Sequence, residues 1–154
     1  MKNITTFRIV CIVVLTMIVS KVCAYDFIYD GIYYRVIKSY NGLTCEVTSG
    51  DNKYVGDIII PEEVTYNNST LFVTSIGERA FSECSALTSV MIPNTVQEIC
   101  KGAFYNCSSL RRVTIPNSVT NIGDIAFEYC HSLNDVTIPN LVTNIGVFAF
   151  DDCN

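Results

Sequence analysis

The sequence predicts a right-handed, mainly β solenoid with a small β cap at its N-terminal end. Three observations lead to this prediction: an apolar leader, a tyrosine-rich stretch after it, and a motif that then recurs every 23 residues. A fixed period of about 20 to 50 residues is typical of stacked repeat architectures. One such unit cannot bury its apolar face alone, so consecutive units must stack into a continuous core.

Residues 1–24 have the pattern of a cleavable signal peptide. Lys2 and Arg8 precede an uncharged, apolar run over residues 9–20, and small or medium residues lead up to Ala24. The run of about 12 residues is short for a membrane span, which needs roughly 20. We therefore expect cleavage after Ala24. An uncleaved anchor stays open as an alternative, as does a lipoprotein attached through Cys23.

The charge balance excludes one class of function. The 154 residues hold 10 Lys and Arg against 15 Asp and Glu, and loss of the leader removes three basic residues and no acidic one. The exported part then has 7 basic and 15 acidic residues, a net charge of −8. Nucleic-acid binding needs clustered basic residues that displace counterions, so no nucleic-acid partner is expected.

Residues 25–72 are predicted to form an N-terminal β cap that includes a half repeat and an insertion. Turn pairs such as Asp30-Gly31 and Asn41-Gly42 separate short β-prone runs. From Pro61 to Pro93 the chain advances 32 residues, nine more than the period, so the segment 65–72 is an inserted hairpin or loop. Such a cap would cover the first unit of the solenoid. The expected strands are 27–29, 32–37, 44–48 and 57–60.

Residues 73–154 hold three full repeats and a fourth, partial one. Each unit reads Val-x-x-Ile-Gly-x-x-Ala-Phe-x-x-Cys-x-x-Leu-x-x-Val-x-Ile-Pro, with Cys100 in place of one Gly. Stacking turns equivalent positions into columns that run along the solenoid. The columns are Ile76, Ile99, Ile122 and Ile145; Phe81, Phe104, Phe127 and Phe150; and Cys84, Cys107, Cys130 and Cys153.

Each part of the unit has a structural interpretation. In Leu-x-x-Val-x-Ile, the Val and Ile lie two residues apart and face the same side of a strand in a parallel sheet. Pro ends that strand, because it has no N–H for the ladder. Val-x-x-Ile-Gly forms a second short extended piece, with Gly allowing a turn at positive φ. Ala-Phe-x-x-Cys is expected to form one short helical turn per repeat.

The repeat wording resembles the BspA-like class of leucine-rich repeats. The likeness is specific over residues 73–153 and looser back to residue 25, where Asp30-Gly31-Ile32-Tyr33-Tyr34 is similar to the usual lead-in of such arrays. This resemblance implies a surface or secreted protein of a host-associated bacterium or a protozoan parasite. It also implies adhesion to host matrix proteins or to other microbes.

The cysteine column answers a question that the composition raises, because eight Cys in a short chain suggest a disulfide scaffold. Two of them leave with the signal peptide, and four occupy one interior column, where a reduced thiol behaves as a small apolar group. A disulfide between neighbouring units is the alternative. Cys45 and Cys100 lie outside the column, and a bridge between them is possible.

The residues do not predict catalysis, a metal site or a cofactor. The single His131 follows Cys130 at a variable position, where a solvent-facing turn residue is expected, and no nucleophile has a positioned base. We therefore predict that the protein is not an enzyme. The sequons at Asn67, Asn68 and Asn106 matter only in a eukaryotic source.

What remains is a binding surface on the strands. Residues that alternate with the inward Val and Ile face outward, and Arg112 and Asp135 would pair laterally. We expect a secreted or cell-surface module that binds protein or glycan ligands and meets the membrane only during export. The alternative is a spacer or truncated paralogue without its own ligand, since the chain stops inside a repeat. The predicted face comprises Asp57, Ile59, Ser89, Met91, Arg112, Thr114, Asp135 and Thr137.

Overall fold

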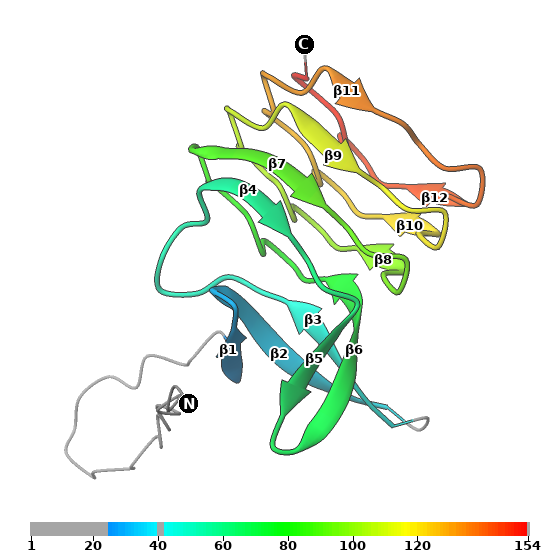
Figure 1. Ribbon diagram of the computed structural model, residues 1–154. Helices are drawn as coiled ribbons and strands as arrows, with labels where there is room; N and C mark the ends of the chain where they lie inside the picture. The colour runs from blue at the N-terminus through cyan, green and yellow to red at the C-terminus, as the bar shows by residue number, and fades with distance from the viewer. Residues whose placement is uncertain (1–24, 40–41, 154) are drawn as a thin grey trace, which may run out of the picture.

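Two β-sheets run along a stack of repeating units in the computed structural model, which describes residues 25–39 and 42–153 (Figure 1). The predicted signal peptide lies outside the described residues. Within the described part there is no helix, and hence none that could cross a membrane. The strands are β1 (Phe27–Tyr29), β2 (Ile32–Ser39), β3 (Gly42–Val47), β4 (Gly56–Ile59), β5 (Glu63–Tyr66), β6 (Ser69–Ile76), β7 (Leu87–Met91), β8 (Glu98–Ile99), β9 (Arg112–Thr114), β10 (Asn121–Ile122), β11 (Asp135–Val136) and β12 (Asn144–Ile145).

Each complete unit gives one strand to each sheet. The first sheet has the order β1-β2-β3-β6-β8-β10-β12, with β5 paired to β6, and the second has the order β11-β9-β7-β4. All pairs between successive units are parallel, because each unit repeats the path of the one before it. The prediction of a solenoid with parallel strands is confirmed, and the Val-x-x-Ile pieces form the first sheet together with the strands of the cap.

The N-terminal strands form the predicted cap. The strands β1, β2 and β3 pair antiparallel, and β3 then joins the solenoid by pairing parallel to β6. The segment 65–72, predicted as an insertion, lies within the β5–β6 hairpin, whose two turn residues Asn67 and Asn68 both have positive φ. Two consecutive residues of this kind are typical of a tight hairpin turn whose twist matches that of its strands.

Tyr54 shows how the cap closes the core. Its ring lies 4.6 Å from that of Phe81, the first ring of the phenylalanine column. Its buried hydroxyl donates to the carbonyl of Thr48 at 2.7 Å and accepts from the N–H of Tyr33 at 3.0 Å. Tyr54 therefore covers the first repeat unit, and its buried hydroxyl has both hydrogen-bond partners within the cap.

The predicted helical turn is wrong, because this segment forms a series of tight turns. Ala80 and Cys84 donate their N–H groups to carbonyls three residues back, whereas Phe81 donates to Ala103 of the next unit. Arg79 and Glu83 have φ of 53° and 61°, and equivalent positions in later units are also left-handed. A residue in the left-handed region interrupts a right-handed helix. In addition, every second N–H of the segment donates to a carbonyl of the next unit, so it is not free for a helical hydrogen bond.

The glycine after the column isoleucine has another role than predicted. Gly77 and Gly123 do not have positive φ. A Cβ on Gly77 would lie 2.7 Å from the carbonyl oxygen of Val47, and one on Gly123 would lie 2.6 Å from the amide nitrogen of Lys101. The motif therefore requires glycine here because the backbones of neighbouring units approach closely, as glycine alone permits.

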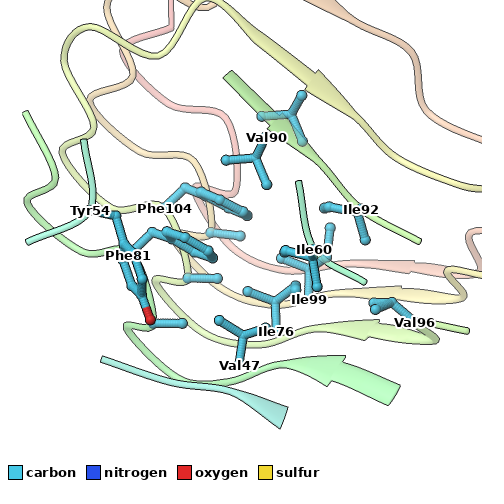
Figure 2. Close-up of a cluster of buried hydrophobic side chains, with 14 of the residues drawn as sticks. Val47, Tyr54, Ile60, Ile76, Phe81, Val90, Ile92, Val96, Ile99 and Phe104 are labelled. Carbon is cyan, nitrogen blue, oxygen red and sulfur yellow. The ribbon is translucent and has the colours of Figure 1, made fainter. Parts of the chain in front are cut away.

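The phenylalanine column forms a continuous stack through the core, of which Figure 2 shows the rings of Phe81 and Phe104. The ring of Phe104 lies 4.9 Å from that of Phe81 and 5.0 Å from that of Phe127, with interplanar angles of 6° and 7°. All three rings are fully buried. Beside the stack, Val47, Ile76 and Ile99 line up on successive strands of the first sheet.

The cysteines of the column are reduced, and their thiols form hydrogen bonds to the neighbouring unit. The Sγ atoms of Cys107, Cys130 and Cys153 donate to the carbonyls of the phenylalanines one unit earlier, at 3.0, 3.1 and 3.2 Å. The six cysteines of the described residues are all free, which agrees with the predicted interior column. Burial raises the pKa of the Cys130 thiol to about 12.

The possible bridge between Cys45 and Cys100 is excluded by the sheet. Cys45 lies in β3, Cys100 follows β8, and β6 lies between these two strands. Two strand spacings amount to about 10 Å, beyond the roughly 7 Å that a disulfide spans between Cα atoms. The Cys45 thiol instead points to the carbonyl of Phe72 at 3.6 Å.

Candidate functional site

The candidate site is the outward side of the second sheet, formed by β4, β7, β9 and β11 and called the strand face below. The register places seven of the eight predicted residues in two rows across the strands. Inward residues such as Val90 and Val113 are buried, so their neighbours in sequence must face solvent. The polar row is Asp57, Ser89, Arg112 and Asp135, and the second row is Ile59, Met91 and Thr114.

Asp57 begins the polar row and is held by hydroxyl groups of the adjacent strand. Its Oδ1 accepts hydrogen bonds from Ser89 Oγ at 2.6 Å and Thr88 Oγ1 at 2.7 Å. These two hydrogen bonds lower the pKa of the Asp57 carboxyl, with Ser89 the larger cause. The carboxylate is therefore a fixed negative charge at this end of the face.

Arg112 and Asp135 form the predicted lateral pair. Arg112 Nε donates to Asp135 Oδ2 at 2.9 Å, and the two side chains are 68% and 60% exposed. An ion pair this exposed is worth only about 0.2–1 kcal/mol, because water screens it. The ion pair can therefore break at little free-energy cost, which leaves both side chains able to bind a ligand.

The second row carries exposed apolar side chains. Ile59 is 69% exposed and Met91 is 53% exposed, and their Cα atoms are direct partners in the β4–β7 pairing. Val55, which precedes β4, is 62% exposed. Apolar side chains that gather in one exposed place, beside polar ones, are typical of an interaction surface.

Thr137 differs from the prediction in its setting. It follows β11, which ends at Val136, so it has no strand partner in the row. It nevertheless lines a shallow hollow of about 120 Å³ together with Arg112, Thr114 and Asp135. Polar side chains from both rows, Arg112 and Asp135 from one and Thr114 from the other, therefore line the same hollow.

The outward side of the first sheet differs because its polar groups bond one another. Asn121 Nδ2 donates to Glu98 Oε1 at 2.6 Å, and Asn144 Nδ2 donates to Asn121 Oδ1 at 2.5 Å. These three residues lie 23 apart, so the repeat period is the signal in the sequence that indicates this ladder. These side chains therefore bond successive units to one another.

No group of three or more His, Cys, Asp or Glu in the described ranges could hold a metal ion. His131 is exposed, as predicted, and its Nδ1 lies 3.1 Å from the carbonyl oxygen of Asp152. Its ring centroid lies 6.0 Å from that of Tyr129. The histidine therefore lies against a backbone carbonyl and the ring of Tyr129.

Comparison with known families decides the identity of the repeat. Residues 62–154 match the model of the BspA type leucine-rich repeat region, in six copies. The chain belongs to this BspA-type leucine-rich repeat family. Leucine-rich repeats commonly mediate protein interactions. No curated protein matches the sequence.

Solved leucine-rich repeat proteins share the fold. One from Bacteroides ovatus is 39% identical with a TM-score of 0.77, over 84% of this chain and 33% of its own. One from Bacteroides capillosus is 30% identical with a TM-score of 0.61, over 73% and 93%. The Treponema pallidum leucine-rich repeat protein is 25% identical with a TM-score of 0.58, over 78% and 64%. This BspA-type chain thus spans about a third of the B. ovatus protein.

Proposed function

We propose that this protein is an exported, non-enzymatic binding module that holds a protein ligand on its strand face. The observation that carries the proposal is the pair of exposed apolar side chains, Ile59 and Met91, next to the exposed Arg112–Asp135 pair on in-register strands. Apolar anchors with a polar surround are the usual anatomy of a protein interface. The strands hold the backbone of this face in register, so a ligand has to order only the exposed side chains.

The two outward sides of the solenoid support this choice of face. On the first sheet, Glu98, Asn121 and Asn144 have already satisfied one another through side-chain hydrogen bonds. On the strand face, Met91 presents apolar area and Arg112 is held only by a weak exposed pair. A ligand therefore has more to gain from the strand face.

Export is the second part of the proposal. The apolar run over residues 9–20 and the small residue Ala24 support cleavage that leaves Tyr25 as the new N-terminus. Expression with the natural leader in a secreting host, followed by mass spectrometry of the released protein, tests this. A protein retained in the membrane with residues 1–24 attached would favour the anchor instead.

The binding face is tested with a pair of variants matched in charge. The double variant Met91→Glu/Arg112→Glu changes the strand face, whereas Gln97→Glu/Lys101→Glu makes the same change of three charges at exposed positions outside it. Binding to immobilised fibronectin, laminin and collagen is measured for both. We expect the first variant to bind at least about tenfold more weakly, as for loss of an interface anchor, and the second to bind normally.

Two outcomes would count against the proposal. Equal binding by both double variants would remove the strand face from the interaction. A properly folded protein that binds none of the matrix proteins would favour the alternative, a spacer without its own ligand.

A further inference from the structure

The N-terminal cap contains a cleft that lies apart from the strand face. The β2–β3 and β5–β6 hairpins leave the solenoid side by side and diverge like a fork (Figure 1). The parallel pairing of β3 with β6 begins only at Thr44 and Phe72, so the strands separate before those residues. A cleft of about 700 Å³ lies between the hairpins, within the roughly 300–1,000 Å³ range of small-molecule sites.

The walls of the cleft combine an apolar lining with a polar rim. Val36 and Leu43 come from one hairpin, and the buried Leu71 comes from the other. The polar lining groups are the Asp26 carboxylate, the Lys38 amine, the Asn67 amide and the Ser69 hydroxyl.

Asp26 has a fixed position in the rim. Its Oδ2 accepts a hydrogen bond of 2.8 Å from the N–H of Val36. Val36 lies in the part of β2 that follows the residues paired with β1, so β1 does not bond this N–H. One acidic and one basic side chain line the cleft, so the site favours neither an anion nor a cation.

An aromatic ring completes the lining. Tyr66 lines the cleft and stacks on Phe27 with ring centroids 4.5 Å apart and planes at 16°, and Phe27 in turn stacks on Tyr34 at 5.3 Å. A ring fixed by such packing offers a rigid surface with an apolar face and a polar hydroxyl, at low entropy cost.

We propose that this cleft binds a neutral saccharide. Such a ligand has an apolar ring face that suits Tyr66 and Leu43, and hydroxyl groups that can donate to Asp26 and accept from Lys38 and Ser69. Its lack of charge matches the balanced rim. The site is independent of the protein-binding role of the strand face.

An extended peptide fits the fork less well. Peptides that bind sheet edges gain affinity from a row of main-chain hydrogen bonds. β6 pairs with β5 along its first half and with β3 from Phe72 onward, so only Ser69–Leu71 lie beside the open fork. Three residues of edge give too short a ladder to hold a peptide strand.

The test uses the purified protein with chitotriose, cellotriose and mannotriose as probes, and amide shifts in NMR spectra as the readout. We expect at least one trisaccharide to shift Lys38, Leu43 and Ser69, with a dissociation constant on the order of 1 mM. Leu43→Glu, at a 48% exposed position, should weaken that binding about tenfold or more. Thr70→Glu is the matched control, because Thr70 faces the other side of β6.

Tyr66→Phe and Tyr66→Ala separate the ring from the hydroxyl. Loss of binding in Tyr66→Ala with retention in Tyr66→Phe would support the stacking role, provided that both variants keep the wild-type amide spectrum outside the cap. The proposal is overturned if no trisaccharide shifts the cleft amides up to about 10 mM. It is also overturned if only a strand-forming peptide such as Thr-Val-Thr-Val-Thr-Val shifts them. Unchanged trisaccharide binding by Met91→Glu/Arg112→Glu would show that this site and the strand face are separate.

Discussion

Replacement of Phe104 by alanine tests whether the stacked phenylalanine column holds the units together. Phe104 is fully buried, and its ring stacks on Phe81 at 4.9 Å and on Phe127 at 5.0 Å. Truncation of a buried Phe to Ala costs about 3–5 kcal/mol. Each lost aromatic pair contributes about 0.5–1.5 kcal/mol of such a loss, and this residue makes two, so we expect a value in the upper part of that range.

The assay is urea-induced unfolding of wild type and variant, followed by circular dichroism and extrapolated linearly to water. Phe148→Ala is the matched control, because that ring is 61% exposed and its removal should cost no more than about 0.5 kcal/mol. Phe104→Leu keeps most of the apolar volume and loses the stacking, so it should fall between the two. The reasoning is refuted if Phe104→Ala costs less than about 1.5 kcal/mol, or if Phe148→Ala costs as much.

Three further predictions concern backbone contact, pH and the surface ion pair. Gly123→Ala should lower the free energy of unfolding in urea by about 1–3 kcal/mol, since its Cβ would lie 2.6 Å from Lys101 N; an unchanged value would contradict the close approach. Raising the pH above 9 should lower stability progressively towards pH 12, because burial raises the pKa of Cys130 to about 12 from 9.0 and the unfolded thiol loses its proton first. Cys130→Ala should flatten that slope, and a profile identical to wild type would show that this thiol does not contribute. A double-mutant cycle on Arg112 and Asp135 should give a coupling of about 0.2–1 kcal/mol that fades in 1 M salt, and a salt-independent coupling would point to a stronger, desolvated pair.

Much of the fold was predictable because the period alone sets which residues stack. Phe81 and Phe104 are 23 residues apart, and a fixed step in a solenoid places equivalent side chains in direct contact. The outward rows followed for the same reason, since Ser89 and Arg112 also differ by one period. Alternation along each strand then decided which residues face solvent.

The turn segment was not predictable from local preferences. Its first left-handed position is occupied by Arg79, Gly102, Ile125 and Phe148, of which only one is glycine. A β-branched residue such as Ile125 strongly disfavours positive φ. The hydrogen bonds between units stabilise this conformation, and they depend on stacking that no local pattern reveals.

The candidate sites also show where the repeat period predicts the structure and where it does not. The repeat period predicts that Thr137 lies on a strand, but β11 ends at Val136, so Thr137 has no strand partner in the second row. The cleft in the cap was not foreseen, because Asp26, Lys38, Tyr66 and Leu71 come from separate segments that share no period. Only the divergence of the two hairpins brings them together.

Six free thiols in the described residues of a protein proposed to be exported require a physical explanation, since oxidising compartments favour disulfides. Disulfide exchange needs an accessible thiolate. Cys107 is fully buried, its thiol donates to the carbonyl of Phe81 at 3.0 Å, and burial raises its pKa. Cys100 is partly exposed, yet burial and the charge of Glu98 raise its pKa to about 12. At neutral pH the six described cysteines therefore hold almost no reactive thiolate.

This protection makes the thiols reporters of the stacked state. With iodoacetamide at pH 7.5, we expect the partly exposed Cys100 and Cys153 to be labelled slowly, and Cys107 and Cys130 only as the units separate in urea. Mass spectrometry of peptides gives the rate at each site. Labelling of Cys107 in the native protein as fast as that of Cys100 would mean that the column opens without unfolding. Burial would then not be what keeps these cysteines reduced.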